Sequence, residues 1–330
     1  MKIRWGILGT AGIAAGCTVP GMLKADNCAV YAVGGRKKEK ALDFQKRFGF
    51  EKAYWDDETE SGYDKLLADS NVQAVYIALP NSLHREWTLR ALRAGKHVLC
   101  EKPLAMNAAE AEEMFSEADK NGVILAEAYA YLHSPYIRSL KEDVQSGLIG
   151  TPVYIDTAFL TQGYKEDFRL HKELGGGMLY DLGCYCTTLI LTLNDSRLSW
   201  AKCCAEMTEL GVDSFSGALL KFENGLRASF NAGMILGENS NSRYDRLFIH
   251  GTKGDIRSEV EYNQEGKLSY RVLLKDGTVL TRNIEAKSNY ALEVEQLGRA
   301  IEGREQPLIT KEFSLKNARL LDLLMKEAGC

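Results

Sequence analysis

The first 130 residues alternate short apolar runs with longer amphipathic stretches, and this rhythm constrains the fold more than any other feature of the sequence. Such alternation is typical of a parallel sheet whose strands are joined by crossover helices. The runs that we interpret as strands are Ile3–Leu8, Ala29–Val33, Ala53–Trp55, Ala74–Ala78, His97–Cys100 and Val123–Ala126. Helices are expected between them, among them Lys37–Phe48, Ser82–Ala94 and Ala108–Lys120. Residues 1–125 are therefore predicted to form a doubly wound α/β domain.

Helix boundaries are marked at two places. Asn107 followed by Glu110 resembles a capping box with Asn in the Ser/Thr role, and Asn121-Gly122 predicts the end of that helix. Ser134-Pro135 predicts an N-cap and first position for a helix that ends at Gly147.

The pattern changes after residue 130, and from Thr151 onward the runs alternate as in antiparallel strands. Two hairpins are predicted: Ser214–Glu223 with Leu226–Met234 across Asn224-Gly225, and Leu268–Lys275 with Val279–Ile284 across Asp276-Gly277. Helices are expected at Tyr290–Ile301 and Leu315–Glu327. We interpret residues 126–330 as an α+β domain with a large, open, mainly antiparallel sheet.

Composition excludes several classes of protein. The 41 Lys and Arg against 45 Asp and Glu give a net charge of -4, which argues against a nucleic-acid partner. No apolar run approaches the roughly 18 residues of a membrane span. The N-terminal stretch shows no export signal, and the eight Cys lack a disulfide-framework spacing. We expect a cytoplasmic protein that binds no membrane. No Cys pair has the usual zinc spacing, so no metal is expected.

A glycine-containing segment at the first strand-to-helix junction indicates a nucleotide site of the Rossmann type. Aligned as G-x-G-x-x-A, its positions are Gly9, Ala11 and Ala14. The first glycine permits the tight turn, the second position lets backbone approach a pyrophosphate, and the third lets helix and strand pack closely. Ala11 departs from the usual glycine, although Gly12 follows it. The expected cofactor contacts are Gly9, Thr10, Ala11, Gly12 and Ile13; a glycine turn in another kind of α/β protein remains the alternative.

The end of the second strand predicts which cofactor binds. An NAD site normally carries Asp or Glu here to bond the ribose hydroxyls, whereas this chain has Arg36 and Lys37. The planar fork of Arg36 suits a 2′-phosphate, and Lys37 adds charge. We expect NADP(H) to be preferred, with NAD(H) possible. A merely solvated helix start remains the alternative.

Several motifs resemble those of the glucose–fructose oxidoreductase/inositol dehydrogenase/rhizopine-catabolism (Gfo/Idh/MocA) family. They are Pro80–His84, Ala94–Ala105 with its Glu-Lys-Pro, Glu127–Tyr129, Ser146–Gly150 and Gly175–Tyr185 with its glycine triplet. The resemblance spans most of the chain. Tyr185 in its Gly-Cys-Tyr-Cys context resembles the branch that holds glucose–fructose oxidoreductase, dimeric dihydrodiol dehydrogenase and NADP-dependent xylose dehydrogenase.

The resemblance implies a proton-transfer pair, Lys102 and Tyr185, with Asp181 orienting the substrate or the lysine. Chemistry supports the roles independently: hydride transfer from an alcohol needs a base for the hydroxyl proton, and an ammonium stabilises the alkoxide. Lys102 follows a strand at the carboxyl end of the predicted sheet, where ligands bind. Asp181 and Tyr185 are four residues apart and would share a helix face. The alternatives are that Tyr185 is a core aromatic residue, that Asp181 caps a helix or is solvated, and that Lys102 is a surface lysine.

The remaining candidates are weaker. The resemblance implies cofactor contacts from Pro80, Asn81, His84, Glu101 and Lys102, and an often cis Lys102–Pro103 bond. For His84, contact with the nicotinamide ribose and a helix-capping role are equally expected. Arg169 and His133 are candidate substrate contacts beside Lys102, Asp181 and Tyr185. Asp167 stands where the xylose dehydrogenase branch has Asn, and His133 could equally be structural.

The function expected is hydride transfer between NADP(H) and a sugar, polyol or related cyclic alcohol or carbonyl. The alternatives are a trans-dihydrodiol dehydrogenase or a deoxy-keto-sugar reductase on the same scaffold, or a non-catalytic NAD(P)-binding sensor. Keeping both Lys102 and Tyr185 argues against the sensor. The resemblance implies that residues 126–330 serve substrate binding and oligomerisation. Family members commonly pair through the open sheet, so a homo-oligomer is expected.

Overall fold

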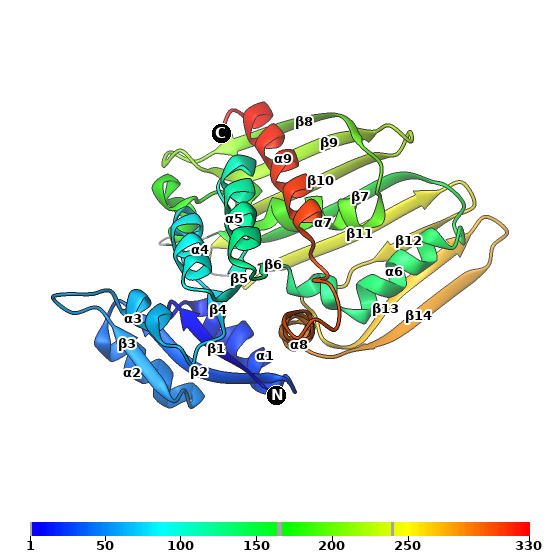
Figure 1. The fold of residues 1–330 in the computed structure, drawn as a ribbon. Coiled ribbons are helices and arrows are strands. Elements are labelled where there is room, and N and C mark those ends of the chain that lie inside the picture. Colours follow the sequence, from blue (N-terminus) through cyan, green and yellow to red (C-terminus); the bar gives the residue numbers. More distant parts are fainter. Residues whose placement is uncertain (1, 164–166, 239–240) are drawn as a thin grey trace. The chain divides into compact units, whose positions relative to one another are not determined.

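A computed structural model describes residues 2–163, 167–238 and 241–330, and the chain in it divides into two compact units. Unit 1 comprises Met1–Ala130 together with Ser288–Leu315, and unit 2 comprises Tyr131–Lys287 together with Lys316–Cys330. Unit 1 therefore differs from the expected range 1–125, because a segment from near the end of the chain returns to it. Figure 1 shows the elements of both units, coloured along the sequence.

Unit 1 is built on a parallel sheet, as the alternating sequence pattern predicts. Within the described residues its six strands lie in the order β3-β2-β1-β4-β5-β6, so that the direction of winding reverses between β1 and β4. The strands are β1 Ile3–Leu8, β2 Cys28–Gly35, β3 Lys52–Trp55, β4 Ala74–Ile77, β5 His97–Glu101 and β6 Leu125–Ala128. The predicted doubly wound fold is confirmed.

The helices of unit 1 include one that follows Tyr131–Lys287 of unit 2 in the sequence. They are α1 Val19–Lys24, preceded by the π-helical turn Ala14–Thr18, then α2 Lys38–Phe48, α3 Gly62–Ala68, α4 His84–Arg93, α5 Ala108–Asn121 and α8 Asn289–Ile301. Helix α8 packs beside α1 and β2 (Figure 1), and Asn27 Nδ2 donates to the Glu295 carbonyl at 2.9 Å.

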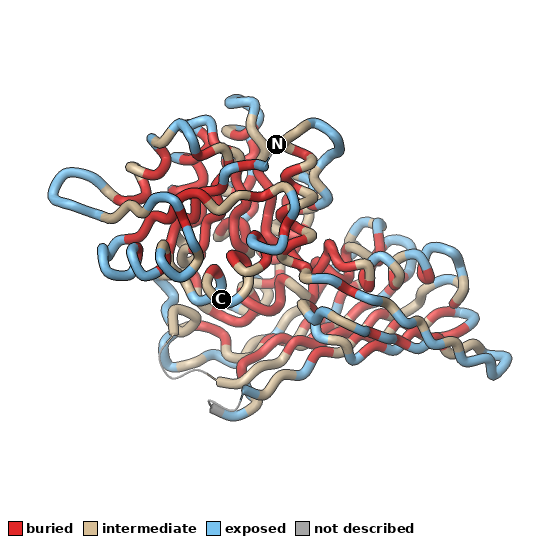
Figure 2. Tube along the Cα trace, turned by 90° about the horizontal axis from the view of Figure 1, so that it is seen from below, coloured by how far each residue is buried: buried red, intermediate tan, exposed pale blue. Residues whose placement is uncertain are grey.

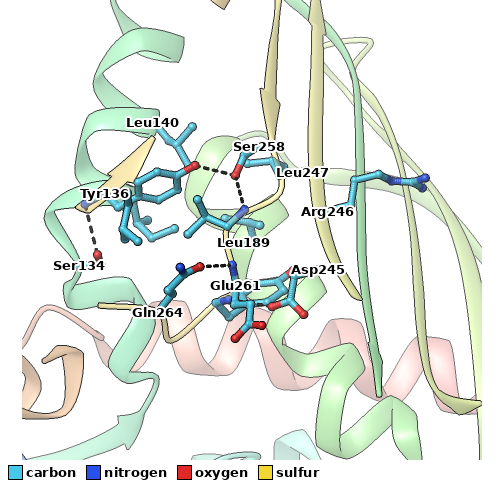
Figure 3. Close-up of a pocket in the computed structure, with 14 residues that line it drawn as sticks. Ser134, Tyr136, Leu140, Leu189, Asp245, Arg246, Leu247, Ser258, Glu261 and Gln264 are labelled. Atoms are coloured by element: carbon cyan, nitrogen blue, oxygen red, sulfur yellow. Dashed lines mark hydrogen bonds between the residues drawn. The ribbon is translucent and has the colours of Figure 1, made fainter. Parts of the chain in front are cut away.

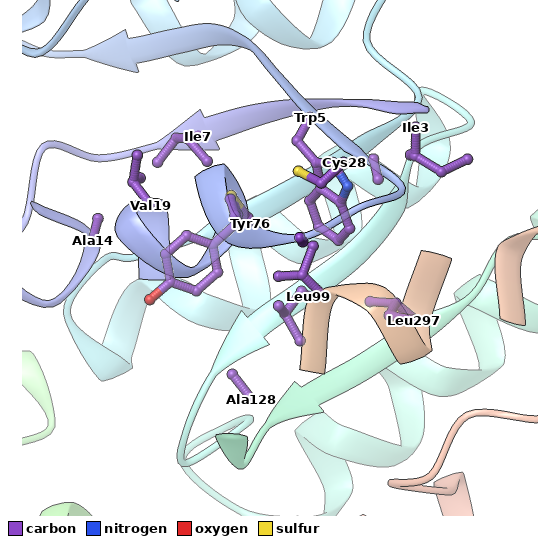
Figure 4. Packing of buried hydrophobic residues seen from close by; sticks show 14 of the residues in the cluster. Ile3, Trp5, Ile7, Ala14, Val19, Cys28, Tyr76, Leu99, Ala128 and Leu297 are labelled. Carbon is purple, nitrogen blue, oxygen red and sulfur yellow. The ribbon is translucent and has the colours of Figure 1, made fainter. Parts of the chain in front are cut away.

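The core of unit 1 lies between the sheet and these helices. Trp5 of β1, Tyr76 of β4 and Leu99 of β5 are almost wholly buried and gather with Leu297 of α8 (Figure 4). In Figure 2 the inner segments of the trace are mostly buried, and the segments at its periphery are mostly exposed. Because parallel strands bury both faces, their apolar runs are continuous, and this is why they could be recognised in the sequence.

Unit 2 is built on a large sheet of mixed direction. Eight strands of the described chain lie in the order β14-β13-β12-β11-β7-β10-β9-β8. They are β7 Pro152–Gly163, β8 Leu198–Met207, β9 Asp213–Phe222, β10 Arg227–Glu238, β11 Arg243–Gly251, β12 Gly254–Ser258, β13 Gly266–Leu274 and β14 Val279–Ala286. Both predicted hairpins are present, β9 with β10 and β13 with β14. The pair β7 and β10 is parallel, which the sequence did not indicate.

Helices cover one face of the unit 2 sheet. Helix α6 Pro135–Gln145 contacts β14, and helix α7 Cys184–Leu193 contacts β7 and β10. Along β11 and β13, buried residues alternate with more exposed ones, as a sheet packed on one face requires. Helix α9, Lys311–Ala328, begins in unit 1 and ends in unit 2. No helix in the described ranges is both long enough and apolar enough to span a membrane.

The predicted caps are confirmed. The Asn107 side chain accepts a hydrogen bond from Glu110 N at 2.9 Å, and Gly122 closes α5 in a left-handed conformation. Glu110 Oε2 in turn accepts from Met106 N at 3.1 Å. The Ser134 side chain caps α6 with Pro135 at its first position, and that helix ends at Gln145, two residues before Gly147.

Candidate active site

The glycine loop of unit 1 leaves no room for a side chain at its first position. Gly9 has φ of +103°, and a Cβ there would lie 2.5 Å from the Ala78 carbonyl oxygen. Its N–H donates to the Gly34 carbonyl at 3.0 Å, so the loop lies between the carboxyl ends of β2 and β4. The Ala11 carbonyl accepts from Ala15 N at 3.0 Å, and the helix therefore begins directly after the loop. A tight turn leading into a helix N-terminus is the geometry that binds a pyrophosphate.

The other predicted cofactor residues of unit 1 lie at the same edge of the sheet. Arg36 and Lys37 follow β2 directly and are exposed. Pro80 and Asn81 follow β4, and Asn81 is buried in the 3₁₀ turn Asn81–Leu83. Because the carboxyl ends of parallel strands share one edge, these residues and the glycine loop line the place where ligands bind in such sheets.

Lys102 lies on a turn whose backbone is held by three buried side chains. It follows β5 directly and is half-buried, and the Lys102–Pro103 bond is cis. The Lys102 N–H donates to Glu101 Oε2 at 3.3 Å, His84 Nδ1 lies 2.8 Å from the Pro103 carbonyl oxygen, and the Leu104 N–H donates to Glu127 Oε1 at 2.9 Å.

Glu101 is itself anchored from beneath. The Tyr76 hydroxyl donates to Glu101 Oε1 at 2.5 Å, and the Thr18 hydroxyl donates to the Tyr76 oxygen at 2.9 Å. Burial, together with the neighbouring Glu101 carboxyl, raises the pKa of Tyr76 well above its usual value. Both Glu101 oxygens are thereby engaged with the protein, so the structure gives Glu101 a role in shaping the turn beside its predicted role at the cofactor.

His84 lies between two backbone carbonyls. Its ring is fully buried, with Nδ1 beside the Pro103 oxygen and Nε2 2.9 Å from the Leu79 oxygen. Burial lowers the pKa of His84 to about 4 although both carbonyls favour the protonated ring, so near neutral pH the ring donates to one carbonyl at a time. It makes no side-chain cap at the start of α4. A bond from this ring to a ribose would have to replace one of the two carbonyl contacts.

In unit 2, Tyr185 lies in a cluster of aromatic rings. Its ring centre is 5.4 Å from that of Tyr131, 5.3 Å from that of Phe159 and 5.4 Å from that of Tyr262. The Tyr131 hydroxyl lies 3.2 Å from the Tyr185 carbonyl oxygen. Packing on three sides fixes the direction of the Tyr185 side chain. Asn263 Nδ2 donates to the Tyr185 hydroxyl at 3.5 Å, a contact that no motif in the sequence indicates.

Asp181 and Arg169 are brought together by an ion pair. Arg169 Nε donates to Asp181 Oδ2 at 2.6 Å, and its Nη1 donates to Asp167 Oδ1 at 3.0 Å. The departure at Asp167 therefore supplies a second carboxylate to the same guanidinium. Asp181 is buried in a π-helical turn, Leu179–Gly183, rather than in the regular α-helix expected between it and Tyr185.

The last glycine of the triplet lets the backbone pass close to the Asp213 side chain. Gly177 has φ of +112°, and a Cβ there would lie 2.3 Å from Asp213 Oδ1. Asp213 Oδ2 accepts from Leu179 N at 2.8 Å and so holds the start of the π-helical turn. His133 is buried at the end of the 3₁₀ segment Ala130–His133 that precedes α6.

A pocket of unit 2 is lined in part by Tyr262 of the aromatic cluster. Figure 3 shows the residues that line this pocket. Tyr136, Ser258 and Tyr262 are among its lining residues, and the Tyr136 hydroxyl lies 2.6 Å from Ser258 Oγ. Its free volume of about 20 Å³ suits a single water molecule and no substrate. Among the described residues, no group of three or more His, Cys, Asp and Glu side chains is arranged to hold a metal ion.

Comparison with known proteins gives matches to both units. Residues 3–129 match the family model described as "Oxidoreductase family, NAD-binding Rossmann fold", and residues 137–257 match the GFO/IDH/MocA C-terminal domain. The chain is 31% identical to D-xylose 1-dehydrogenase (NADP(+)) 2 of Haloferax volcanii, over 99% of this chain and 97% of that protein. It is 32% identical to trans-1,2-dihydrobenzene-1,2-diol dehydrogenase of Xenopus tropicalis, over 78% and 75%.

A solved structure has the same fold along the whole chain. The 3-ketoreductase KijD10 from Actinomadura kijaniata, in complex with NADP and TDP-benzene, superposes with a TM-score of 0.88 at 28% identity, covering 99% of this chain and 98% of that one.

Proposed function

Since the chain belongs to the Gfo/Idh/MocA family of NAD(P)-dependent oxidoreductases, we propose that it transfers a hydride between NADP(H) and a sugar, polyol or related cyclic alcohol or carbonyl compound. The observation that carries this proposal is the clamped turn that presents Lys102 at the sheet edge where the glycine loop lies. A lysine held in place at a ligand-binding edge is what charge stabilisation in a reduction requires.

The residues of unit 1 fit a dinucleotide. The Gly9 turn admits backbone close to a pyrophosphate, and the following helix presents its N-terminal N–H groups. Arg36 and Lys37 are exposed at the end of β2 and are suited to a 2′-phosphate, which favours NADP(H) over NAD(H). NADP is also the nucleotide bound in the KijD10 complex. When bound, the nicotinamide accepts or supplies the hydride.

The chain's own residues handle the proton and the charge. In the oxidative direction we assign to Tyr185 the removal of the proton from the substrate hydroxyl, and to Lys102 the stabilisation of the negative charge that develops on that oxygen. In reduction the same phenol returns the proton. Asp181 and Arg169 form a charged pair that can orient the hydroxyl groups of a substrate. His133 stays a candidate lining residue.

The test is a panel of aldoses, polyols and cyclic diols, assayed with NADP and NAD, and of the matching carbonyl compounds with NADPH. Turnover is followed by the absorbance of the reduced nicotinamide. Lys102→Ala and Tyr185→Phe are expected to lower kcat at least about 100-fold with little change in cofactor affinity. Wild-type turnover by both variants would refute the assignment.

The same panel separates the alternative substrates. A preference for trans-dihydrodiols over aldoses would favour a dihydrodiol dehydrogenase activity. The 32% identity to the Xenopus tropicalis enzyme supports this alternative. Reduction of dTDP-linked deoxy-keto-sugars would favour a 3-reductase, since an Actinomadura kijaniata relative of that name is 38% identical over 56% of this chain.

We also propose a homo-oligomer and a cytoplasmic location. Trp200, Leu219 and Ile235 are large apolar side chains on neighbouring strands of unit 2, and each is about half exposed. An exposed apolar sheet face is typical of an interface between copies. In the described part of the chain no disulfide joins any of the eight cysteines, as a reducing compartment would leave them.

A further inference from the structure

The peptide that follows Lys102 is held from two sides by buried side chains of different elements. Glu127, near the end of β6, accepts the Leu104 N–H at 2.9 Å. His84, at the start of α4, lies 2.8 Å from the Pro103 carbonyl oxygen. Each contact is made to a backbone group, so the two contacts do not depend on the side chains of residues 103 and 104.

Burial of the Glu127 carboxyl is unfavourable in free energy. Glu127 is 3% exposed, and its second oxygen, Oε2, has no hydrogen-bond partner of ordinary geometry among the described residues. Burying a carboxyl costs free energy unless it is fully hydrogen-bonded. An apolar side chain at this position would avoid that cost, but it could not accept the Leu104 N–H. The bond from Leu104 N–H to Glu127 Oε1 is therefore a backbone contact that this carboxyl supplies and an apolar side chain could not.

We propose that Glu127 is a positioning residue for Lys102, which acts by fixing the Pro103–Leu104 backbone so that the lysine side chain is presented in one direction. This inference rests on the proposed function of Lys102 and gives a role to Glu127, which lies in the motif Glu127–Tyr129 but to which the sequence assigns no role. A side chain that must stabilise charge in a transition state needs a fixed origin, because small displacements lower the rate steeply.

The electrostatic surroundings couple Glu127 to the same lysine. The groups that face its carboxyl are Lys102 and Cys100 from β5 and its turn, Tyr129 beyond β6 and Ser314 of α9. Burial raises the pKa of Glu127 to about 7, while Ser314, Leu104 N, Tyr129 and the Lys102 charge oppose the rise. The carboxyl therefore changes charge near neutral pH, and its ionised form favours the ammonium form of Lys102 and strengthens the Leu104 bond.

The experiment compares Glu127→Ala with Glu127→Gln in the full-length enzyme with NADP(H) and its best substrate. Glu127→Ala removes the acceptor, and we expect kcat to fall about 10- to 100-fold while the dissociation constant for NADP(H) changes less than about twofold. Glu127→Gln keeps a carbonyl oxygen for Leu104 N–H and is expected to retain most of kcat. It should also lack the inflection near pH 7 in log kcat that we expect for the wild type.

A matched control is Glu110→Ala, because Glu110 also accepts a backbone N–H of this segment, that of Met106, but from a partly exposed position farther along the chain. We expect it to lower the unfolding temperature without changing kcat or the pH profile. Glu127→Ala in the Lys102→Ala background should cause no further loss of kcat, because a residue that acts through Lys102 has nothing left to position.

The outcomes separate this inference from the proposed function. Full activity of Lys102→Ala would overturn the proposed function itself. Loss of activity in Lys102→Ala together with a wild-type kcat in folded Glu127→Ala would overturn only the positioning role. If Glu127→Ala does not fold, Glu127→Gln decides: an unchanged inflection near pH 7 contradicts the inference, and its disappearance supports it.

Discussion

We predict that the choice of cofactor depends on Arg36. It is exposed at the carboxyl end of β2, where an acidic side chain would otherwise bond ribose hydroxyls. A guanidinium makes two parallel hydrogen bonds to a phosphate, whereas it gains little from a hydroxyl pair.

Replacing Arg36 by Ala is therefore expected to raise the KM for NADP about 10- to 100-fold, the loss of one charge-assisted contact, with little change in the KM for NAD. Steady-state kinetics with each nucleotide measures this. Arg47→Ala, an exposed arginine at the other end of α2, serves as the control and should leave both constants unaltered. Equal effects of Arg36→Ala on the two cofactors would contradict the preference.

The raised pKa of Glu127 also has a consequence for stability. The folded-state pKa is about 7 and the ordinary value is 4.5, so between these pH values the folded chain keeps a proton that the unfolded chain has lost. Stability from this group is present below about pH 4.5 and is lost as the pH rises to about 7, a change of about 3 kcal/mol.

Glu127→Gln cannot ionise, so its unfolding free energy relative to the wild type should increase from pH 5 to pH 8. Denaturant unfolding of both proteins at the two pH values measures the difference. A constant difference between the variants would show that Glu127 ionises with an ordinary pKa.

Candidate site residues could be identified where a motif carries them, and their roles stay predictions, whereas contacts that depend on long-range packing could not be identified. Lys102, Tyr185 and Gly9 stand in recognisable patterns. The contacts of Glu127 with Leu104 and of Asn263 with Tyr185 join residues far apart in the sequence, and no local pattern specifies them. For Asp181, the ion pair with Arg169 could have been suspected only from their opposite charges.

At the scale of elements, α5 shows how local chemistry sets a boundary. The Asn107 side chain accepts from Glu110 N, one of the helix N–H groups that would otherwise lack a partner. Replacing Asn107 by Ala should lower the free energy of unfolding by about 1 kcal/mol, whereas Asn107→Ser should keep most of it. Thermal unfolding compares the variants, and an Asn107→Ala variant as stable as the wild type would mean that the cap contributes nothing.

The strands and hairpins were largely predictable because a buried strand or a tight turn has a recognisable local sequence pattern. Continuous apolar runs mark β1, β4 and β5, and Asn224-Gly225 marks the turn between β9 and β10. The parallel pairing of β7 with β10 was not, because the two strands lie far apart in the sequence and pair through the sheet as a whole. The π-helical turn at Asp181 likewise depends on Asp213, which lies at the start of β9.

For the whole molecule, assembly is expected to depend on the outward face of the large sheet. Leu219 is 54% exposed near the middle of β9, opposite Lys202 of β8. Leu219→Glu should shift the protein to a smaller species in light scattering after gel filtration, because a charge placed in an apolar interface is costly to desolvate.

The control for this shift is Leu210→Glu, a comparably exposed leucine in the turn between β8 and β9 rather than on the face of the sheet. It should leave the mass unaltered. A wild-type protein that is already monomeric, or a Leu219→Glu variant of full oligomeric mass, would contradict the proposed interface.

The return of α8 to unit 1 governs the order of events during synthesis. Leu297 packs in the same cluster as Trp5, Tyr76 and Leu99, yet it is translated only after all of Tyr131–Lys287. Until α8 has been made, the nascent sheet lacks part of its apolar cover, so the core of unit 1 is completed only after the residues of unit 2 up to Lys287 have been translated.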